Sequence, residues 1–157
     1  MKIAFLTVGK TTDAHIAALV ADYASRIAHY APFEMSCVPE LKGARALTFE
    51  EQKAREAEGI KKLLRQGDYI VLLDERGKEP RSMELATWLE KRMRQAPRRL
   101  VFIVGGPYGF DKTIYEIAQE QLSLSRMTFS HQMVRLFFTE QLYRAFTILR
   151  GEKYHHE

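Results

Sequence analysis

The sequence predicts an α/β fold in which helices cover a mostly parallel sheet, and three observations lead to this prediction. Segments of strand composition alternate along the chain with segments of helical pattern, which is typical of wound α/β domains. Two of the strand segments, 69–74 and 100–104, are continuous apolar runs of the kind that is buried on both faces. The length of 157 residues is that of one domain, so we interpret 1–157 as a single domain.

Each expected element has its own local signal. Thr11, Thr12 and Asp13 are cap candidates for the first helix, and Ser82 is the cap candidate for the third. Glycine after the second helix and proline after the third mark their ends. The expected strands are 2–8, 33–38, 69–74 and 100–104, and the expected helices between them are 12–30, 48–65 and 82–95.

The last third of the chain departs from simple winding. After a glycine-rich turn at 105–110 we expect a short helix at about 111–120, an irregular segment at 122–131 and a long helix to about residue 150. The apolar positions of the long helix are spread more widely than the single stripe that one core contact requires. Two interpretations stay open: the helix pairs with its copy in a homodimer, or it lies deep inside one chain.

Composition excludes several classes of protein. The hydrophobic and charged fractions, 46% and 28%, are those of a globular domain rather than of a disordered chain. Cys37 is the single cysteine, so no intrachain disulfide is possible and a reducing, cytoplasmic location is favoured. No apolar run approaches the length of about 18 residues that predicts a membrane span. The net charge of +4 permits an acidic partner such as nucleic acid without requiring one.

Two polar segments follow the two buried strands. Gly105, Gly106 and Gly109 surround a turn where a backbone can approach a ligand closely, although a tight strand-to-helix turn explains the same glycines. Asp74 and Glu75 stand at the carboxyl edge where open α/β sheets bind ligands, or else they begin a solvated turn. Common dinucleotide-binding folds carry the glycine turn after the first strand, so its late position disfavours them.

The remaining candidates are basic or aromatic. The five histidines show no ligand spacing with Cys37 or with carboxylates, so we expect no metal site. For His131 taken alone, a capping or packing role is favoured over a catalytic one. The stretch from Arg144 to the end mixes cationic and aromatic side chains, as recognition of single-stranded RNA requires, although it is also compatible with a frayed tail.

In order and spacing these motifs resemble the RlmH (YbeA-like) family of the SPOUT methyltransferases, over essentially the whole chain. The matching motifs are Val8-Gly9-Lys10, Leu73-Asp74-x-x-Gly77-Lys78, Gly105-Gly106-Pro107-x-Gly109, Leu122-Ser123-Leu124-Ser125 with Met127-Thr128-Phe129, His131, Glu140-Gln141-Leu142-Tyr143-Arg144-Ala145 and Tyr154-His155. The resemblance implies a SPOUT fold with a C-terminal trefoil knot and a homodimer whose substrate sites lie between protomers. One departure is Ser130, because the family usually has proline before the histidine.

The resemblance also implies an activity and the residues that perform it. The activity is S-adenosylmethionine-dependent methylation of N3 of a pseudouridine in 23S ribosomal RNA, with the large subunit or the whole ribosome as substrate. Substrate contacts are expected at Arg135 and Tyr154, and we expect Arg144 or His155 to stabilise the imide anion, with His131 as the next candidate base. The expected cofactor contacts are Leu73, Gly105, Leu124, Ser125, Arg126, Met127, Thr128 and Phe129.

Two other functions are kept as alternatives. A catalytically silent protein of the same fold would bind the ribosome or RNA without methyl transfer, and affinity for the cofactor separates it from the enzyme. An enzyme acting on nucleotides or acidic metabolites would instead use the glycine turn for phosphate and would bind ATP or NAD.

Overall fold

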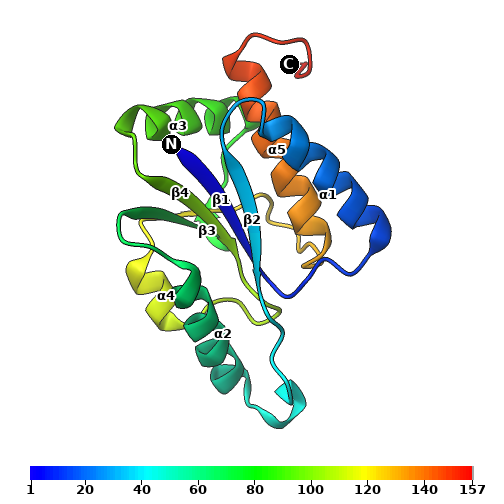
Figure 1. The fold of residues 1–157 in the computed structure, drawn as a ribbon, viewed down its shortest axis with the longest axis vertical. Coiled ribbons are helices and arrows are strands. Elements are labelled where there is room, and N and C mark those ends of the chain that lie inside the picture. Colours follow the sequence, from blue (N-terminus) through cyan, green and yellow to red (C-terminus); the bar gives the residue numbers. More distant parts are fainter. Residues whose placement is uncertain (157) are drawn as a thin grey trace.

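The computed structural model describes residues 1–156, and within them five parallel strands form one sheet in the order β2-β1-β4-β3-β5 (Figure 1). The expected α/β class is therefore confirmed. The strands are β1 (Lys2–Val8), β2 (Phe33–Val38), β3 (Asp68–Lys78), β4 (Arg99–Val104) and β5 (Glu120–Leu122). The helices are α1 (Ala14–Ile27), η1 (Ala44–Ala46), α2 (Phe49–Leu63), α3 (Ser82–Gln95), α4 (Lys112–Ile117) and α5 (Met133–Leu149).

The sheet has an apolar layer on each side, because successive strand residues point to opposite faces. On one side Phe5 and Phe102 belong to the cluster that packs against α1, α3 and α5. On the other side Leu6 and Ile103 belong to the cluster that packs against α2 and α4. Figure 1 shows α5 running beside α1 on one side of the sheet, and α2 beside α4 on the other side, in the lower part of the view.

The breadth of the apolar surface on α5 is largely explained within one chain. Phe138 lies against both Phe5 and Phe102, at ring-centroid distances of 4.6 and 4.7 Å. Tyr143 and Phe146 turn to Tyr30 beside α1, at 6.2 and 5.2 Å. These contacts bury one face of the helix within the chain, but Phe137 on the same helix is 40% exposed, so the homodimer interpretation stays open beside the internal one.

Two expectations about the third strand and the helix after the glycine turn were wrong. The strand does not end at Asp74: Leu73 and Lys78 both pair with Leu122, so the residues between them form an outward bulge within β3. The helix ends at Ile117 instead of about residue 120, and β5 follows it. Backbone and side chain of Gln119 both bond to Ile70, at 2.9 and 2.6 Å, which sets the start of that pairing.

No helix in the described part of the chain, residues 1–156, is long and apolar enough to span a bilayer. Within the same residues, no group of three or more His, Cys, Asp or Glu side chains is arranged to hold a metal ion.

Candidate functional site

A cavity of about 560 Å³ opens at the carboxyl ends of β3 and β4, between the turn that follows β4 and the loop that precedes α5. This edge of a parallel sheet is where open α/β folds bind ligands, and the volume is that of a small-molecule site. Its walls are made by Lys53, Leu73–Arg76, Val104–Phe110, Tyr115, Ser123–Ser125, Met127–His131 and Val134.

The first two glycines of the turn, Gly105 and Gly106, have close neighbours where a side chain would begin. A Cβ on Gly105 would lie 3.2 Å from the carbonyl oxygen of Gly109, and one on Gly106 would lie 2.6 Å from a carboxylate oxygen of Glu56. Gly109 has a φ of 82°, and its amide donates to the Gly106 carbonyl at 3.1 Å. The tight strand-to-helix turn is therefore confirmed, and because it also forms a wall of the cavity, close approach of its backbone to a ligand stays a prediction.

Glu56 is a residue that the sequence analysis missed. Its side chain is 5% exposed on α2, directly behind Gly106, and within residues 1–156 its Oε1 has no hydrogen-bond partner. Burial raises the pKa of this carboxyl, and a hydrogen bond from Gln52 opposes the rise. The signal in the sequence was its position next to apolar Ala57 and four residues before apolar Ile60, both of which are buried on the same helix.

Asp74 is held in place at the cavity rather than free in a solvated turn. Its Oδ1 accepts from the backbone amide of Arg76 at 2.8 Å, and its Oδ2 accepts from the hydroxyl of Tyr115. Burial, followed by this hydrogen bond, raises the pKa of Tyr115 to about 12. The guanidinium of Arg76 lies over the Tyr115 ring, 5.8 Å from its centroid. A carboxylate and a cation are thereby fixed on one wall.

The loop before α5 supplies the opposite wall. Ser123 donates to the carbonyl of Ser125 at 2.9 Å, and the Ser125 hydroxyl accepts from the amide of Met127 at 2.9 Å, so the loop is folded by its own hydroxyl groups. Of the eight residues expected to contact a cofactor, seven line the cavity. Arg126 is the exception, because its side chain is 92% exposed and lies 4.0 Å from Glu79.

His131 also lines the cavity, at the start of α5. The preceding Ser130 accepts through its hydroxyl from the amide of Met133 at 3.1 Å and through its carbonyl from Val134 at 3.0 Å. Serine in place of the expected proline therefore stabilises the first turn of the helix. Gln132 adds a link to the β1–α1 loop, accepting from Thr12 at 2.8 Å.

The structure gives Arg135 a different place from the expected substrate contact. Its side chain is 1% exposed and donates to the carbonyls of Val8, Gly9 and His131 at 2.9 to 3.1 Å, and to the Thr11 hydroxyl at 3.0 Å. Burial lowers the pKa of this guanidinium. We therefore correct the expectation: Arg135 ties the loop after β1 to the cavity wall and offers no surface to a substrate.

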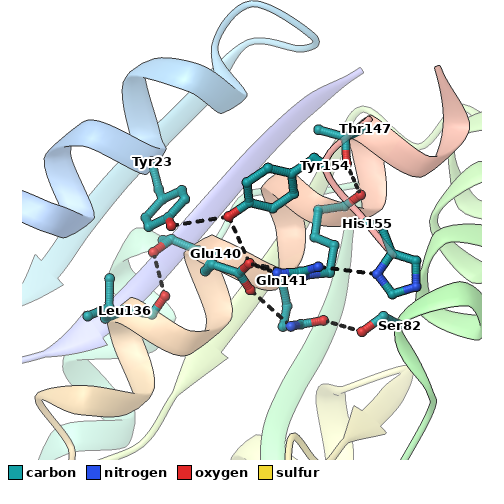
Figure 2. Close-up of polar contacts among 10 residues, drawn as sticks. Tyr23, Ser82, Leu136, Glu140, Gln141, Thr147, Tyr154 and His155 are labelled. Atoms are coloured by element: carbon teal, nitrogen blue, oxygen red, sulfur yellow. Dashed lines mark hydrogen bonds and ion pairs between the residues drawn. The ribbon is translucent and has the colours of Figure 1, made fainter. Parts of the chain in front are cut away.

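The C-terminal residues form a second polar site, which we call the C-terminal cluster: Tyr23, Glu140, Arg144, Tyr154 and His155 (Figure 2). Glu140 Oε1 accepts from Arg144 Nε at 3.0 Å and from the Tyr154 hydroxyl at 3.0 Å. Arg144 Nη1 lies 3.2 Å from His155 Nδ1, and its guanidinium lies 4.8 Å from the centroid of the Tyr154 ring. The Tyr23 and Tyr154 hydroxyls lie 3.2 Å apart. The tail is therefore ordered against α5 and α1 instead of frayed.

Charge is balanced within this cluster. The hydrogen bond to Glu140 raises the pKa of Arg144, and burial raises that of Tyr154, followed by its bonds to Tyr23 and Glu140. Arg144 therefore stays cationic and Tyr154 stays neutral near neutral pH. The Arg144 guanidinium is the cationic group of the cluster, its charge is offset by Glu140, and the Tyr154 hydroxyl already donates to Glu140.

One chain does not bring the two sites together. Val134 lines the cavity and Arg144 lies ten residues further along α5, which corresponds to about 15 Å of helix. A smaller cavity of about 290 Å³ shares Leu73 and Leu124 with the first and reaches Gln141, next to the cluster. His131 thus belongs to the cavity, whereas Arg144, Tyr154 and His155 belong to the C-terminal cluster.

Comparison with known sequences gives full-length similarity. A family model described as "Predicted SPOUT methyltransferase" matches residues 1–155. Proteins named "Ribosomal RNA large subunit methyltransferase H" are 53% identical in Parabacteroides distasonis and 54% identical in Phocaeicola vulgatus, each over 157 residues and 100% of both chains. The protein of that name from Christiangramia forsetii is 48% identical over 99% of each chain.

Solved structures agree on the fold. A probable methyltransferase from Bordetella pertussis Tohama I superposes with a TM-score of 0.56 at 13% identity, covering 91% of this chain and 93% of the other. A probable methylase family protein from Haemophilus influenzae Rd KW20 gives 0.53 at 15% identity, covering 97% and 67%. At such identities the likeness concerns the architecture alone.

Proposed function

Because the chain belongs to the SPOUT methyltransferases, within the RlmH family, we propose that it transfers a methyl group from S-adenosylmethionine to N3 of a pseudouridine in 23S ribosomal RNA. The proposed substrate is the large subunit or the assembled ribosome in the bacterial cytoplasm. The observation that carries this proposal is the cavity, because seven residues expected from the family's motifs meet there from three separate segments of the chain.

The cavity suits S-adenosylmethionine in shape and charge. Leu73, Leu124 and Phe129 offer apolar walls for an adenine ring, and the glycine turn leaves backbone exposed where side chains would clash. Asp74 and Glu75 can face the sulfonium and ammonium groups of the ligand, while Lys53 and Arg76 line the same cavity and balance the overall charge. The bound cofactor would supply the electrophilic methyl carbon.

The protein's part in the reaction is to position the nucleophile and to stabilise its anion. N3 of pseudouridine is a weakly acidic imide nitrogen, so it attacks after losing its proton. In our proposal Arg144 and His155 face the developing imide anion, and His131 is the candidate acceptor of the proton. Glu140 keeps the Arg144 side chain extended along α5, which fixes the direction of its charge.

A homodimer would bring the two halves of this site together. About 15 Å of α5 separates the cavity from the C-terminal cluster in one chain, so a partner chain running in the opposite direction can place its cluster over the cavity. Phe137 and Met127 are exposed next to the cavity and offer apolar surface for that contact. We therefore propose a homodimer whose substrate site contains residues of both protomers.

Titration calorimetry with S-adenosylmethionine, followed by methyl transfer to ribosomes that lack the modification, tests this function. We expect micromolar binding by a dimer and incorporation of one methyl group at the pseudouridine. Gly105→Val should weaken binding at least tenfold, because its side chain would enter the space between Gly109 and Phe110. Ala54→Val adds bulk at an exposed position of α2 and should bind normally.

The outcomes separate the alternatives. Cofactor binding without methyl transfer to ribosomes would favour the catalytically silent RNA-binding protein. Binding of ATP or NAD in place of S-adenosylmethionine would show that the cavity serves a different chemistry.

A further inference from the structure

Two exposed aromatic rings stack on each other at the rim of the cavity, and nothing in the proposed methyl transfer uses them. Phe49 is 61% exposed and Tyr108 is 43% exposed, with ring centroids 4.0 Å apart and planes inclined by only 24°. We call this pair the aromatic rim. Single exposed apolar residues are ordinary, whereas a stacked pair at the mouth of a site marks a candidate contact surface.

The fold places the aromatic rim beside the cavity and on the side of the sheet away from α5. Tyr108 belongs to the glycine turn and lines the cavity, and Phe49 is the first residue of α2. Lys53 follows Phe49 by one helical turn and also lines the cavity, and Glu56 follows by another against Gly106. One face of α2 thus carries Phe49 at the rim of the cavity, Lys53 in its wall and Glu56 behind the glycine turn.

Charged groups of both signs surround the aromatic rim, which suits a polar partner better than an apolar one. Lys53 and Arg76 line the cavity, and Lys42 and Arg45 are exposed in the segment just before α2. Glu50 pairs with Lys53 at 2.9 Å, and Glu51 beside it, together with Asp74 and Glu75 in the cavity, offsets the remaining positive charge. Two rings flanked by charged side chains are too small a patch for the apolar core of a protein interface, but they match the size of one nucleobase.

We propose that the aromatic rim stacks an unpaired base of the RNA strand that carries the target nucleotide, next to the nucleotide that enters the cavity. The inference rests on the proposed function, because it takes RNA as the substrate. Stacking on aromatic side chains is how proteins hold splayed-out bases of single-stranded RNA, and it tolerates any base. The rim would hold the strand while the C-terminal cluster and the cavity act on its neighbour.

Two substitutions at Phe49 separate stacking from simple apolar contact. Phe49→Leu keeps an apolar side chain but removes the ring, and we expect the KM for ribosomes to rise by about 5- to 100-fold. Phe49→Tyr keeps the ring and should stay within about twofold of the wild type. The Kd for S-adenosylmethionine should be unchanged in both. An unchanged KM in Phe49→Leu, or an equal loss of cofactor affinity, would show that the pair only supports the glycine turn.

Photocrosslinking identifies the occupant without relying on methyl transfer. With benzoyl-phenylalanine in place of Phe49, irradiation of the protein bound to ribosomes should give a crosslink to 23S ribosomal RNA near the target nucleotide. A crosslink to a ribosomal protein instead, or none from the bound complex, would overturn the proposal. Failure of the wild-type protein to methylate ribosomes would count against the proposed function, whereas the crosslink still decides what the aromatic rim touches.

Discussion

Two glutamates show how differently the two halves of the site are built. Glu140, in the C-terminal cluster, accepts hydrogen bonds from Arg144, Tyr154 and Gln141. Glu56, behind the cavity, is buried against Gly106, and within the described chain its Oε1 has no hydrogen-bond partner. One half of the site is thus a network of hydrogen-bonded side chains, and the other is a close-packed backbone with a carboxyl behind it, one oxygen of which has no hydrogen-bond partner within the described residues.

The difference follows from what each half has to recognise. A neutral or cationic small molecule is held well by backbone and apolar walls that need little rearrangement, so glycines and a self-bonded loop suffice. An anion that develops only during reaction is better met by a charge that is fixed beforehand, and Glu140 and Tyr154 fix that of Arg144. Changes in the cluster should therefore affect turnover, and changes around Glu56 should affect stability or cofactor binding.

The largest effect is expected for Arg144→Ala. Removing the fixed positive charge should lower kcat on ribosomes by about 10²- to 10³-fold, while the Kd for S-adenosylmethionine changes little. Arg144→Lys keeps the positive charge but loses the planar guanidinium with its several N–H donors. Its kcat should lie between those of the wild type and Arg144→Ala. Steady-state kinetics together with calorimetry measure both quantities. A parallel loss of cofactor affinity would contradict the division of labour between the halves.

A smaller effect, on stability and its pH dependence, is expected for Glu56→Gln. Burial raises the pKa of Glu56 in the folded state above the value of about 4.5 that it has in the unfolded chain. As pH rises past 4.5, the unfolded chain therefore releases this proton at a lower pH than the folded chain does, which favours unfolding. The free energy of unfolding of the wild type therefore carries a penalty that is absent at low pH and grows as pH rises. Glutamine has no such penalty, so the variant should gain relative stability from pH 4.5 to 7.5.

Urea denaturation at several pH values measures this difference. Glu58→Gln is the matched control, because it removes the same charge from an exposed position on the same helix. A stability difference for Glu56→Gln that does not vary with pH would mean that the carboxyl gains a partner in solution.

The fold could be predicted from local patterns wherever those patterns are long. The limits of β1, β2 and α3 agree with the structure residue for residue, because alternating or continuous apolar runs mark them. The expected cap of α3 was wrong by one residue: Arg81 stands at the N-cap, and Ser82 is the first helical residue and donates its hydroxyl to Gln141. β5 is only three residues long, and its pairing depends on Gln119 bonding to Ile70 across the sheet. No local pattern carries that information. The trefoil knot and the homodimer likewise stay predictions from the family resemblance.

The residues of the site could be predicted where a sequence motif identifies them. They could not be predicted where the role of a charged side chain depends on whether the fold buries it. The glycine turn and the loop before α5 meet as the resemblance implies. Arg135 was expected to reach outward, yet it is buried because the carbonyls at the end of β1 satisfy its donors. Glu56 was missed because a glutamate on a charged helix is normally solvated.

The smallest effect is expected at Ser130, where the family resemblance leads us to expect proline. Ser130→Pro removes the hydroxyl that accepts from Met133 at 3.1 Å, which costs about 1 kcal/mol. Proline also restricts the unfolded chain, which stabilises by about 0.4–1 kcal/mol if the backbone accepts it. These terms nearly cancel, so stability should change by less than about 1 kcal/mol and kcat by less than about threefold. Thermal unfolding and kinetics on ribosomes, with Ser130→Ala to isolate the hydroxyl, check this. A large loss in Ser130→Pro but not in Ser130→Ala would mean that His131 needs a backbone at residue 130 that proline cannot adopt, and that the loop entering α5 is set differently here from that of its relatives.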